Sequence, residues 1–162
     1  MMQAATSLLI EAVDAQHPQA LALLREAALE ASALYPALFA SDAPAPTNPP
    51  LRAGEIYLLA WRDGLAIGCG ALHRHDTFTG EVRRLFVTRD ARREGVARAL
   101  LLRLEHEARR HGDRQLVLET DARQPAAIAL YRSCGWRRIA AWGTFVGDPA
   151  SACFGKALQS RG

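Results

Sequence analysis

The segment from Arg84 to Arg98 holds the residues best suited to binding an anion. It reads as a strand that ends at Val87, then an arginine-rich loop, then a helix that starts near Gly95. The first turn of a helix leaves about four backbone N–H groups unpaired and carries roughly half a positive charge. Gly95 lets the backbone approach a ligand closely, and Ala97 leaves the next turn unobstructed. This junction predicts a phosphate site, and a diphosphate suits it best.

Basic residues concentrate in the same stretch of the chain. Between positions 81 and 98, six arginines stand against three acidic residues, whereas the whole chain has a net charge of only +3. This local excess suits one polyanionic small molecule. A nucleic-acid binder more often carries an extended basic face with aromatic platforms, so we expect no nucleic-acid partner.

Other residue patterns that suggest chemistry fail on spacing. His106 and His111 resemble a zinc-binding helix motif, but residues five apart lie about 140° apart around a helix and cannot grip one ion. His73 and His75 share a face, yet two ligands without a third favour an exposed loop pair over a metal site. We therefore predict no metal. Gly68 begins no dinucleotide fingerprint, because the third glycine and the helix are missing.

The three cysteines, Cys69, Cys134 and Cys153, are widely spaced and form no C-x-x-C pair. They indicate free thiols in a reducing compartment, with Cys134 buried and inert near a helix end. No apolar run reaches the ~20 residues of a membrane helix, and no basic residue precedes the first apolar run as a secretory signal requires. We expect a cytoplasmic protein with no membrane partner.

The elements that must position the junction alternate along the chain. At 162 residues and 49% hydrophobic composition, we expect a single domain over 1–162. Alternating periodicities indicate an α/β fold with a mixed sheet covered by helices. The predicted strands span 7–13, 55–61, 65–72, 81–88, 115–120, 136–142 and 152–157, and the predicted helices span 18–34, 94–111 and 124–134.

Hydrophobic spacing also predicts which helix residues face the core. Residues 62–64 (Arg-Asp-Gly) predict a hairpin turn between the second and third strands. Positions 35–52 contain five prolines and read either as a surface loop or as a loop covering the substrate. The predicted inward residues are Leu21, Leu24, Ala28, Leu29 and Ala31 in the first helix, and Val96, Leu100, Leu104 and Ala108 in the second.

The pattern Arg92-x-x-Gly95-x-Ala97 resembles the acetyl-CoA signature of the GNAT N-acetyltransferase superfamily, in which Arg or Gln, Gly, and Gly or Ala hold these positions. The next elements match in order, and the resemblance runs from about residue 55 to the C-terminus. Segments 68–72, 81–87, 118–120 and 153–158 resemble, more narrowly, a bacterial branch labelled YsnE-like. The other matching residues are Leu116, Leu118, Glu119 and Thr120, then Ala126, Ala127, Ala129, Leu130, Tyr131, Gly135 and Trp136.

The resemblance implies a single-domain GNAT fold: a mixed, mostly antiparallel sheet of six to seven strands flanked by helices and splayed between strands four and five. It implies acetyl-CoA as cosubstrate and a backbone N–H near Val87 as the oxyanion donor. Family members commonly have Gly at the position of Arg93, and Phe or Tyr at that of Trp136. The implied cofactor-binding residues are Leu85, Phe86, Val87, Arg92, Arg93, Glu94, Gly95, Val96, Ala97, Arg98 and Gln124.

Acetyl transfer to an amine sets requirements for the site. An amine attacks only when neutral, and a lysine-type amine is only about 0.04% neutral at pH 7. The departing thiolate gains from a nearby proton donor, and a phenol of pKa about 10 can serve. Tyr131 matches the family's acid. The alternative is a packed aromatic residue whose hydroxyl merely finds a partner.

Two glutamates are candidates for the base. Glu81 matches the glutamate base of histone-type members, and its even spacing from Val87 predicts that both share one sheet face with Arg83 and Leu85. Alternatively, Glu81 is a solvated carboxylate, paired with Arg83 or a neighbouring strand. Glu119 matches a glutamate implicated in the family branch that acts on ribosomal proteins. The alternative is a structural role for Glu119, in an ion pair with an arginine.

The acceptor remains open at the level of sequence. We expect a primary amine of a small molecule, such as an amino acid or amine metabolite, and direct transfer without a covalent enzyme intermediate. Arg83 or Arg84 offers a partner for an acceptor carboxylate. The alternatives are acetylation of protein N-termini or lysines, and a non-catalytic acyl-CoA-binding module. Edge strands near the C-terminus favour a homodimer.

Overall fold

The computed structural model describes residues 7–36 and 44–159, so the predicted loop at 35–52 is described only in part. Its elements follow the predicted alternation of strands and helices. In chain order they are β1 (Leu9–Val13), α1 (Pro18–Leu34), β2 (Ile56–Arg62), β3 (Leu65–Asp76), β4 (Thr79–Val87), the 3₁₀ turn η2 (Arg89–Ala91), α2 (Val96–His111), β5 (Gln115–Asp121), α3 (Pro125–Ser133), β6 (Arg137–Arg138), the 3₁₀ turn η3 (Gly143–Phe145) and β7 (Ser151–Ala157).

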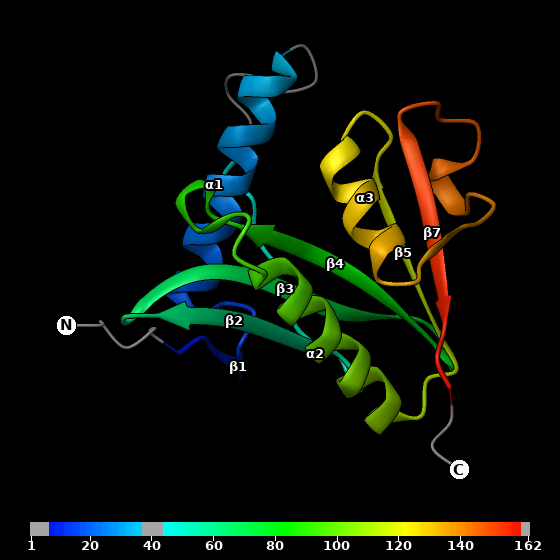
Figure 1. Ribbon diagram of the computed structural model, residues 1–162, viewed down its shortest axis with the longest axis horizontal. Helices are drawn as coiled ribbons and strands as arrows, with labels where there is room; N and C mark the ends of the chain where they lie inside the picture. Colours follow the sequence, from blue (N-terminus) through cyan, green and yellow to red (C-terminus); the bar gives the residue numbers. More distant parts are fainter. Residues whose placement is uncertain (1–6, 37–43, 160–162) are drawn as a thin grey trace.

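The strands form one seven-stranded sheet in the order β1-β2-β3-β4-β5-β7-β6. Every neighbouring pair is antiparallel except β4 and β5, which run parallel. That parallel pairing covers only Thr79–Glu81 against Gln115–Val117. Beyond these residues the two strands part (Figure 1). The predicted α/β class and the splay between the fourth and fifth strands are confirmed.

Helices cover the two faces of the sheet. On one face α2 and α3 pack on the larger core cluster, which includes Leu100, Leu104, Leu118 and Phe154. On the other face α1 packs on a second cluster, which includes Tyr57, Cys69, Ala71 and Phe86. Figure 1 shows α2 crossing in front of β2 to β4. We call these two sides the α2 face and the α1 face.

The helix faces were predicted correctly for α2 and incorrectly for part of α1. Val96, Leu100, Leu104 and Ala108 are all buried. In α1, however, burial is confined to Ala20, Leu23 and Leu24, and Leu29 is 71% exposed. The later turns of α1 rise beyond the sheet in Figure 1, so no strand lies beneath them.

The boundaries of two predicted strands were wrong by several residues. The third strand continues beyond residue 72 to Asp76, because it pairs with β4 as far as Thr79. His73 therefore lies within a strand and is buried, not in an exposed loop. The strand predicted at 136–142 is reduced to Arg137–Arg138, the only residues there that pair with β7. The hairpin turn predicted at 62–64 is present but shorter, because Arg62 still belongs to β2 and only Asp63 and Gly64, both with positive φ, form the turn.

A β-bulge in β4 overturns the prediction that Glu81, Arg83, Leu85 and Val87 share a face. Between the pairs Cys69–Phe86 and Ala71–Arg83, β3 advances by two residues and β4 by three. Arg84 is the bulged residue, and its backbone lies in the left-handed region with φ 60°. An extra residue reverses the alternation of side chains beyond it. Glu81 and Arg83 therefore lie on the α1 face, whereas Leu85 and Val87 pack in the core of the α2 face.

Candidate active site

The loop before α2 forms a cradle of backbone N–H groups. The helix begins at Val96 rather than at the predicted residue 94, because Gly95 is its N-cap with φ 83°. Arg93 also lies in the left-handed region, with φ 65°. A loop with left-handed residues at alternate positions turns its successive N–H groups toward one side. Within the described part of the chain, the N–H groups of residues 93–98 have no hydrogen-bond partner.

The surroundings of this cradle favour an anion. The first turn of α2 contains no acidic residue. Glu94, which precedes it, is bound by Arg62 of β2, so its charge is balanced. A β-carbon built on Gly95 would meet no atom within 4 Å, which leaves open space in front of the cradle. Free donors, a positive helix end and open space fit the diphosphate of acetyl-CoA.

Two arginines predicted to bind the cofactor are engaged within the protein. The guanidinium of Arg92 donates to the Val87 carbonyl at 2.9 Å and to Glu30 of α1 at 2.7 Å. This hydrogen bond is the main reason that the pKa of Glu30 is lowered. Arg98 donates to Ser133 at 2.8 Å and to the Cys134 sulfur at 3.4 Å. These side chains join the cradle to its neighbours, so anion binding there rests on backbone groups.

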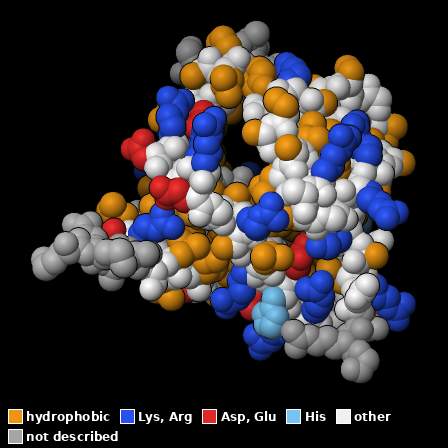
Figure 2. All heavy atoms as spheres, in the orientation of Figure 1, with side chains coloured by type: hydrophobic (Ala, Val, Ile, Leu, Met, Phe, Trp, Pro, Cys, Tyr) orange, Lys and Arg blue, Asp and Glu red, His pale blue; other side chains and the backbone are white. Residues whose placement is uncertain are grey.

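Beyond their short parallel pairing, β4 and β5 diverge and leave an opening in the sheet. Beyond Glu81, residues 82–87 of β4 pair with β3 on one side and with no strand on the other. The edge of β4 is thus available to a ligand, as expected for the oxyanion donor near Val87. Figure 2 shows the surface hollowed between the α1 side and the α3 side, where Figure 1 shows the strands diverging.

Tyr131 lies on α3 in the core of the α2 face and is 7% exposed. Its ring packs near Trp136 and Phe154, with ring centroids 6.1 and 6.0 Å away. Burial, together with the nearby carboxylate of Glu119, raises the pKa of Tyr131 to about 12. The phenol is therefore protonated throughout the physiological range and available as a donor.

Glu119 lies on β5, two residues beyond the end of the parallel pairing. The alternative of an ion pair with an arginine was wrong, because no arginine in the described chain lies within ion-pairing distance. Burial raises the pKa of Glu119, and the nearby carboxylates of Asp121, Asp148 and Glu81 add to the shift. A raised pKa makes a carboxylate a better base near neutral pH.

Glu81 is buried on the α1 face and bound by Arg83, whose Nε lies 3.0 Å from its carboxylate. The expected pairing with Arg83 is therefore present. Because cross-strand partners point to the same side, Glu81 faces the same side as its partners His73 on β3 and Val117 on β5. Glu119, two residues after Val117, also faces that side. The two candidate bases thus lie on the α1 face, near the opening.

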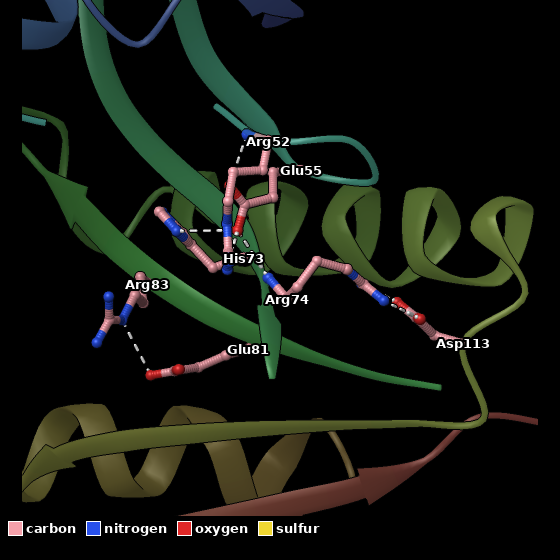
Figure 3. A network of polar contacts seen from close by, with 7 residues as sticks. All are labelled: Arg52, Glu55, His73, Arg74, Glu81, Arg83 and Asp113. Carbon is pink, nitrogen blue, oxygen red and sulfur yellow. Dashed lines mark hydrogen bonds and ion pairs between the residues drawn. The ribbon is translucent and has the colours of Figure 1, made fainter. Parts of the chain in front are cut away.

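Sequence reasoning missed a polar network beside Glu81, drawn in Figure 3. Glu55 accepts backbone hydrogen bonds from Arg52 at 2.8 Å and Arg74 at 2.9 Å, and its carboxylate lies 3.5 Å from His73 Nδ1. Burial opposes its charge, but these hydrogen bonds lower the pKa of Glu55 overall. Burial lowers the pKa of His73 despite Glu55. Glu55 was visible only as the start of a strand, so only the fold connects it to the site.

Gln124, predicted to bind the cofactor, links α3 to α1. Its side-chain amide donates to the Tyr35 hydroxyl at 3.1 Å, and the guanidinium of Arg123 stacks on the Tyr35 ring at 4.1 Å. This contact joins the end of α1 to the start of α3, on opposite sides of the hollow. The Pro-rich segment begins at Tyr35, but residues 37–43 lie outside the described part.

A small cavity lies on the α1 face beside β4. It has a volume of about 170 Å³, and its lining includes Leu24, Tyr57, Cys69 and Arg84. Arg84 donates from Nε to Asn48, which is 5% exposed. Asn48 belongs to the Pro-rich segment, and no sequence signal separated it from ordinary loop residues.

Comparison with known proteins places this geometry in a family. The model of the acetyltransferase (GNAT) family matches residues 20–136. An IAA acetyltransferase of Azospirillum brasilense is 42% identical over 104 residues, which cover 63% of this chain and 67% of that protein. The uncharacterized N-acetyltransferase YsnE of Bacillus subtilis is 34% identical over 111 residues, covering 67% and 74%.

Among solved structures, one from Klebsiella pneumoniae subsp. pneumoniae, provisionally named an acyl-CoA N-acyltransferase, superposes with a TM-score of 0.76 at 30% identity. It covers 94% of this chain and 98% of that one. The chain therefore belongs to the GNAT family of acetyltransferases and is an N-acetyltransferase that uses an acyl-CoA. The resemblance to this family and to YsnE is confirmed.

No helix within residues 7–36 and 44–159 is both long and apolar enough to cross a bilayer. In the same ranges, no three His, Cys, Asp or Glu side chains come together as a metal site would require.

Proposed function

We propose that the protein transfers an acetyl group from acetyl-CoA to the primary amine of a small molecule. One observation carries this proposal: the diphosphate cradle lies at the start of α2, the candidate bases and a small cavity lie on the α1 face, and the opening between β4 and β5 joins them. Two substrates can approach the opening from opposite sides of the sheet and meet there.

The residues of the cradle and of β4 would hold acetyl-CoA. Backbone N–H groups of residues 93–98 would bind the diphosphate, and the open edge of β4 would orient the thioester. Acetyl-CoA supplies an activated acetyl group when it is bound. The positions of Arg92 and Arg98, each fixed by contacts within the protein, keep the cradle in place before binding.

The acid and base would act from the two faces. Glu81 accepts a proton from the amine on the α1 face, directly or through water, with Glu119 as the rival base. The new N–C bond forms as the C–S bond breaks. Tyr131 donates a proton to the departing sulfur and regains one from solvent. Because the pKa of Tyr131 is about 12, a hydrogen bond to sulfur precedes any full proton transfer.

The size of the cavity supports a small acceptor. A volume of about 170 Å³ lies below the roughly 300 Å³ at which sites for drug-sized ligands begin, so the cavity suits only a small group. A folded protein substrate would need an open groove for its chain, and a lysine would enter this cavity only at its tip.

A panel of acceptors tests the proposal through release of free CoA thiol. The panel contains amino acids, simple amines, peptides with free N-termini and peptides with an internal lysine. We expect turnover with small amines and little with peptides. Turnover confined to peptides would contradict the small-molecule assignment. Binding of acetyl-CoA without turnover on any acceptor would contradict the enzymatic one.

A further inference from the structure

The cavity on the α1 face has a mostly apolar lining with one charged side chain. Leu24 and Ala27 of α1 form one wall, and Tyr57, Cys69 and Phe86 of the sheet form the other. Leu85 and a single charged residue, Arg84, complete the lining. An apolar cavity with one charged group at its side is suited to a ligand that has both characters.

One of the three guanidinium nitrogens of Arg84 donates a hydrogen bond within the protein, and the other two are available to a ligand. Its Nε donates to Asn48 Oδ1 at 3.0 Å. Asn48 is itself fixed, because its Nδ2 donates to the Ala15 carbonyl at 2.9 Å. Within the described chain, Nη1 and Nη2 of Arg84 have no hydrogen-bond partner and no ion pair. A fork of two oriented N–H donors matches the two oxygens of a carboxylate.

The position of Arg84 comes from the bulge in β4. A residue other than glycine in the left-handed region costs on the order of 1 kcal/mol or more, and such strain clusters at functional sites. The neighbouring Arg83, the other candidate for this role, is bound by Glu81. Glu26 on α1 lies near Cys69 but forms no ion pair with Arg84 within the described chain.

A second polar group of the cavity also lacks a partner. The hydroxyl of Tyr57 is buried and forms no hydrogen bond with any residue that the structure describes. Asn48 and the Cys69 thiol lie close to it, but neither meets the geometry of a hydrogen bond. A buried polar group without a partner is costly, and it indicates a place that a ligand or an ordered water fills.

We propose that the acceptor carries a carboxylate in addition to its primary amine, and that Arg84 binds this carboxylate. The inference rests on the proposed function and narrows it to acceptors of the amino-acid class. Arg84 lies three residues from Glu81, roughly 10 Å along the strand. The side chains of Arg84 and Glu81, with a small amino acid between them, span that distance. Binding of the carboxylate by Arg84 would therefore place the amine toward Glu81.

Matched acceptors and a variant test this assignment. Alanine is compared with alaninamide, and β-alanine with its amide, at equal concentrations of the neutral amine. The variant is Arg84→Asn, because Asn tolerates the left-handed backbone. We expect the wild type to prefer the acids in kcat/KM. The variant should lose roughly tenfold to a hundredfold on the acids, since it removes charge-assisted hydrogen bonds, and change less than about twofold on the amides.

A control variant separates this contact from the general charge of the site. Arg89→Gln removes an exposed arginine of η2 that does not line the cavity, so its acid-to-amide ratio should equal that of the wild type. Arg84→Gln provides a second variant, and circular dichroism verifies folding. Equal use of acids and amides by the wild type, or equal losses on both in folded Arg84 variants, would overturn the inference.

A binding measurement keeps this test separate from the proposed function. Calorimetry with N-acetylalanine and N-acetylalaninamide requires no turnover. The inference predicts tighter binding of the acid and loss of that preference in Arg84→Asn. If turnover fails with every amine while the preference persists, the carboxylate site stands and the proposed reaction is wrong. If turnover occurs without any preference, the reaction stands and the carboxylate site is wrong.

Discussion

The two faces of the sheet offer different kinds of groups to their expected ligands. On the α2 face, the diphosphate cradle is one continuous stretch, residues 93–98, and its donors are backbone N–H groups. On the α1 face, the polar groups are side chains from separate elements, such as Asn48, His73, Glu81 and Arg84. Backbone donors bind any diphosphate, so many side chains are allowed there. Side-chain groups decide which acceptor enters.

The largest expected effect concerns Tyr131, the proton donor proposed on the α2 face. Tyr131→Phe removes a proton donor without removing ground-state contacts, so kcat should fall by roughly 10² to 10⁴ while acetyl-CoA affinity is unchanged. Steady-state kinetics and calorimetry measure the two quantities. Because the pKa of Tyr131 is about 12, the wild-type pH profile should show no alkaline limb from this residue below about pH 11.

Turnover within twofold of the wild type, in a variant whose chemical step limits the rate, would show that Tyr131 is not the acid. The function of the α2 face would then be cofactor binding alone. An unexpected loss of acetyl-CoA affinity would instead indicate that the hydroxyl contributes to binding.

The second prediction compares the two candidate bases on the α1 face. A base must be ionised, so its protonation produces the acidic limb of the kcat/KM profile. Glu81→Gln should lower the plateau about a hundredfold and displace or flatten this limb, and Glu119→Gln should leave it in place. One acceptor of known amine pKa is used throughout, because deprotonation of the amine also creates an acidic limb.

The pKa shift at Glu119 sharpens this comparison. Burial raises its pKa, so as the base it would place the midpoint of the limb above the ordinary glutamate value, with activity lost as pH falls through it. If Glu119→Gln abolishes the limb and Glu81→Gln spares it, the assignment is reversed. If neither variant changes the limb, the amine arrives neutral and bulk water takes the proton.

The contrast between the continuous cradle and the scattered side chains of the α1 face also explains how much of the site was predictable from the sequence. The cradle was predictable because its residues are consecutive and glycine marks the turn; the alternation of elements and the splayed sheet followed from periodicity and resemblance. The sheet face on which Leu85 lies was not predictable from the sequence. The extra residue at Arg84 reverses the alternation of side chains, and no residue type marks the position of such a bulge. Asn48 and Glu55 join the site only through tertiary contacts, which no local pattern encodes.

The third prediction tests the backbone cradle. Gly95→Val forces a β-branched residue into φ 83°, and the strained loop turns its N–H groups away from the diphosphate. Calorimetry should show acetyl-CoA affinity at least tenfold weaker, or ~1.4 kcal/mol. Gly112→Val is the matched control, since Gly112 caps the other end of α2 at φ 98° with equally open space. It should lose stability and keep its affinity. Unchanged affinity in folded Gly95→Val would contradict the phosphate assignment.

The smallest expected effect is a gain in stability at the same loop. Arg93 lies at φ 65°, a region that costs an arginine on the order of 1 kcal/mol more than a glycine. Arg93→Gly relieves that strain but adds freedom to the unfolded chain, so we expect a net gain of about 0.5 kcal/mol in the free energy of unfolding by urea. Arg89→Gly makes the same exchange at an exposed position without positive φ, and it should lose stability by a similar amount. Opposite signs for the two variants would show that the cradle is held in a strained conformation that the rest of the fold maintains. A loss at both positions would mean that the side chain of Arg93 contributes more to the folded state than its backbone costs.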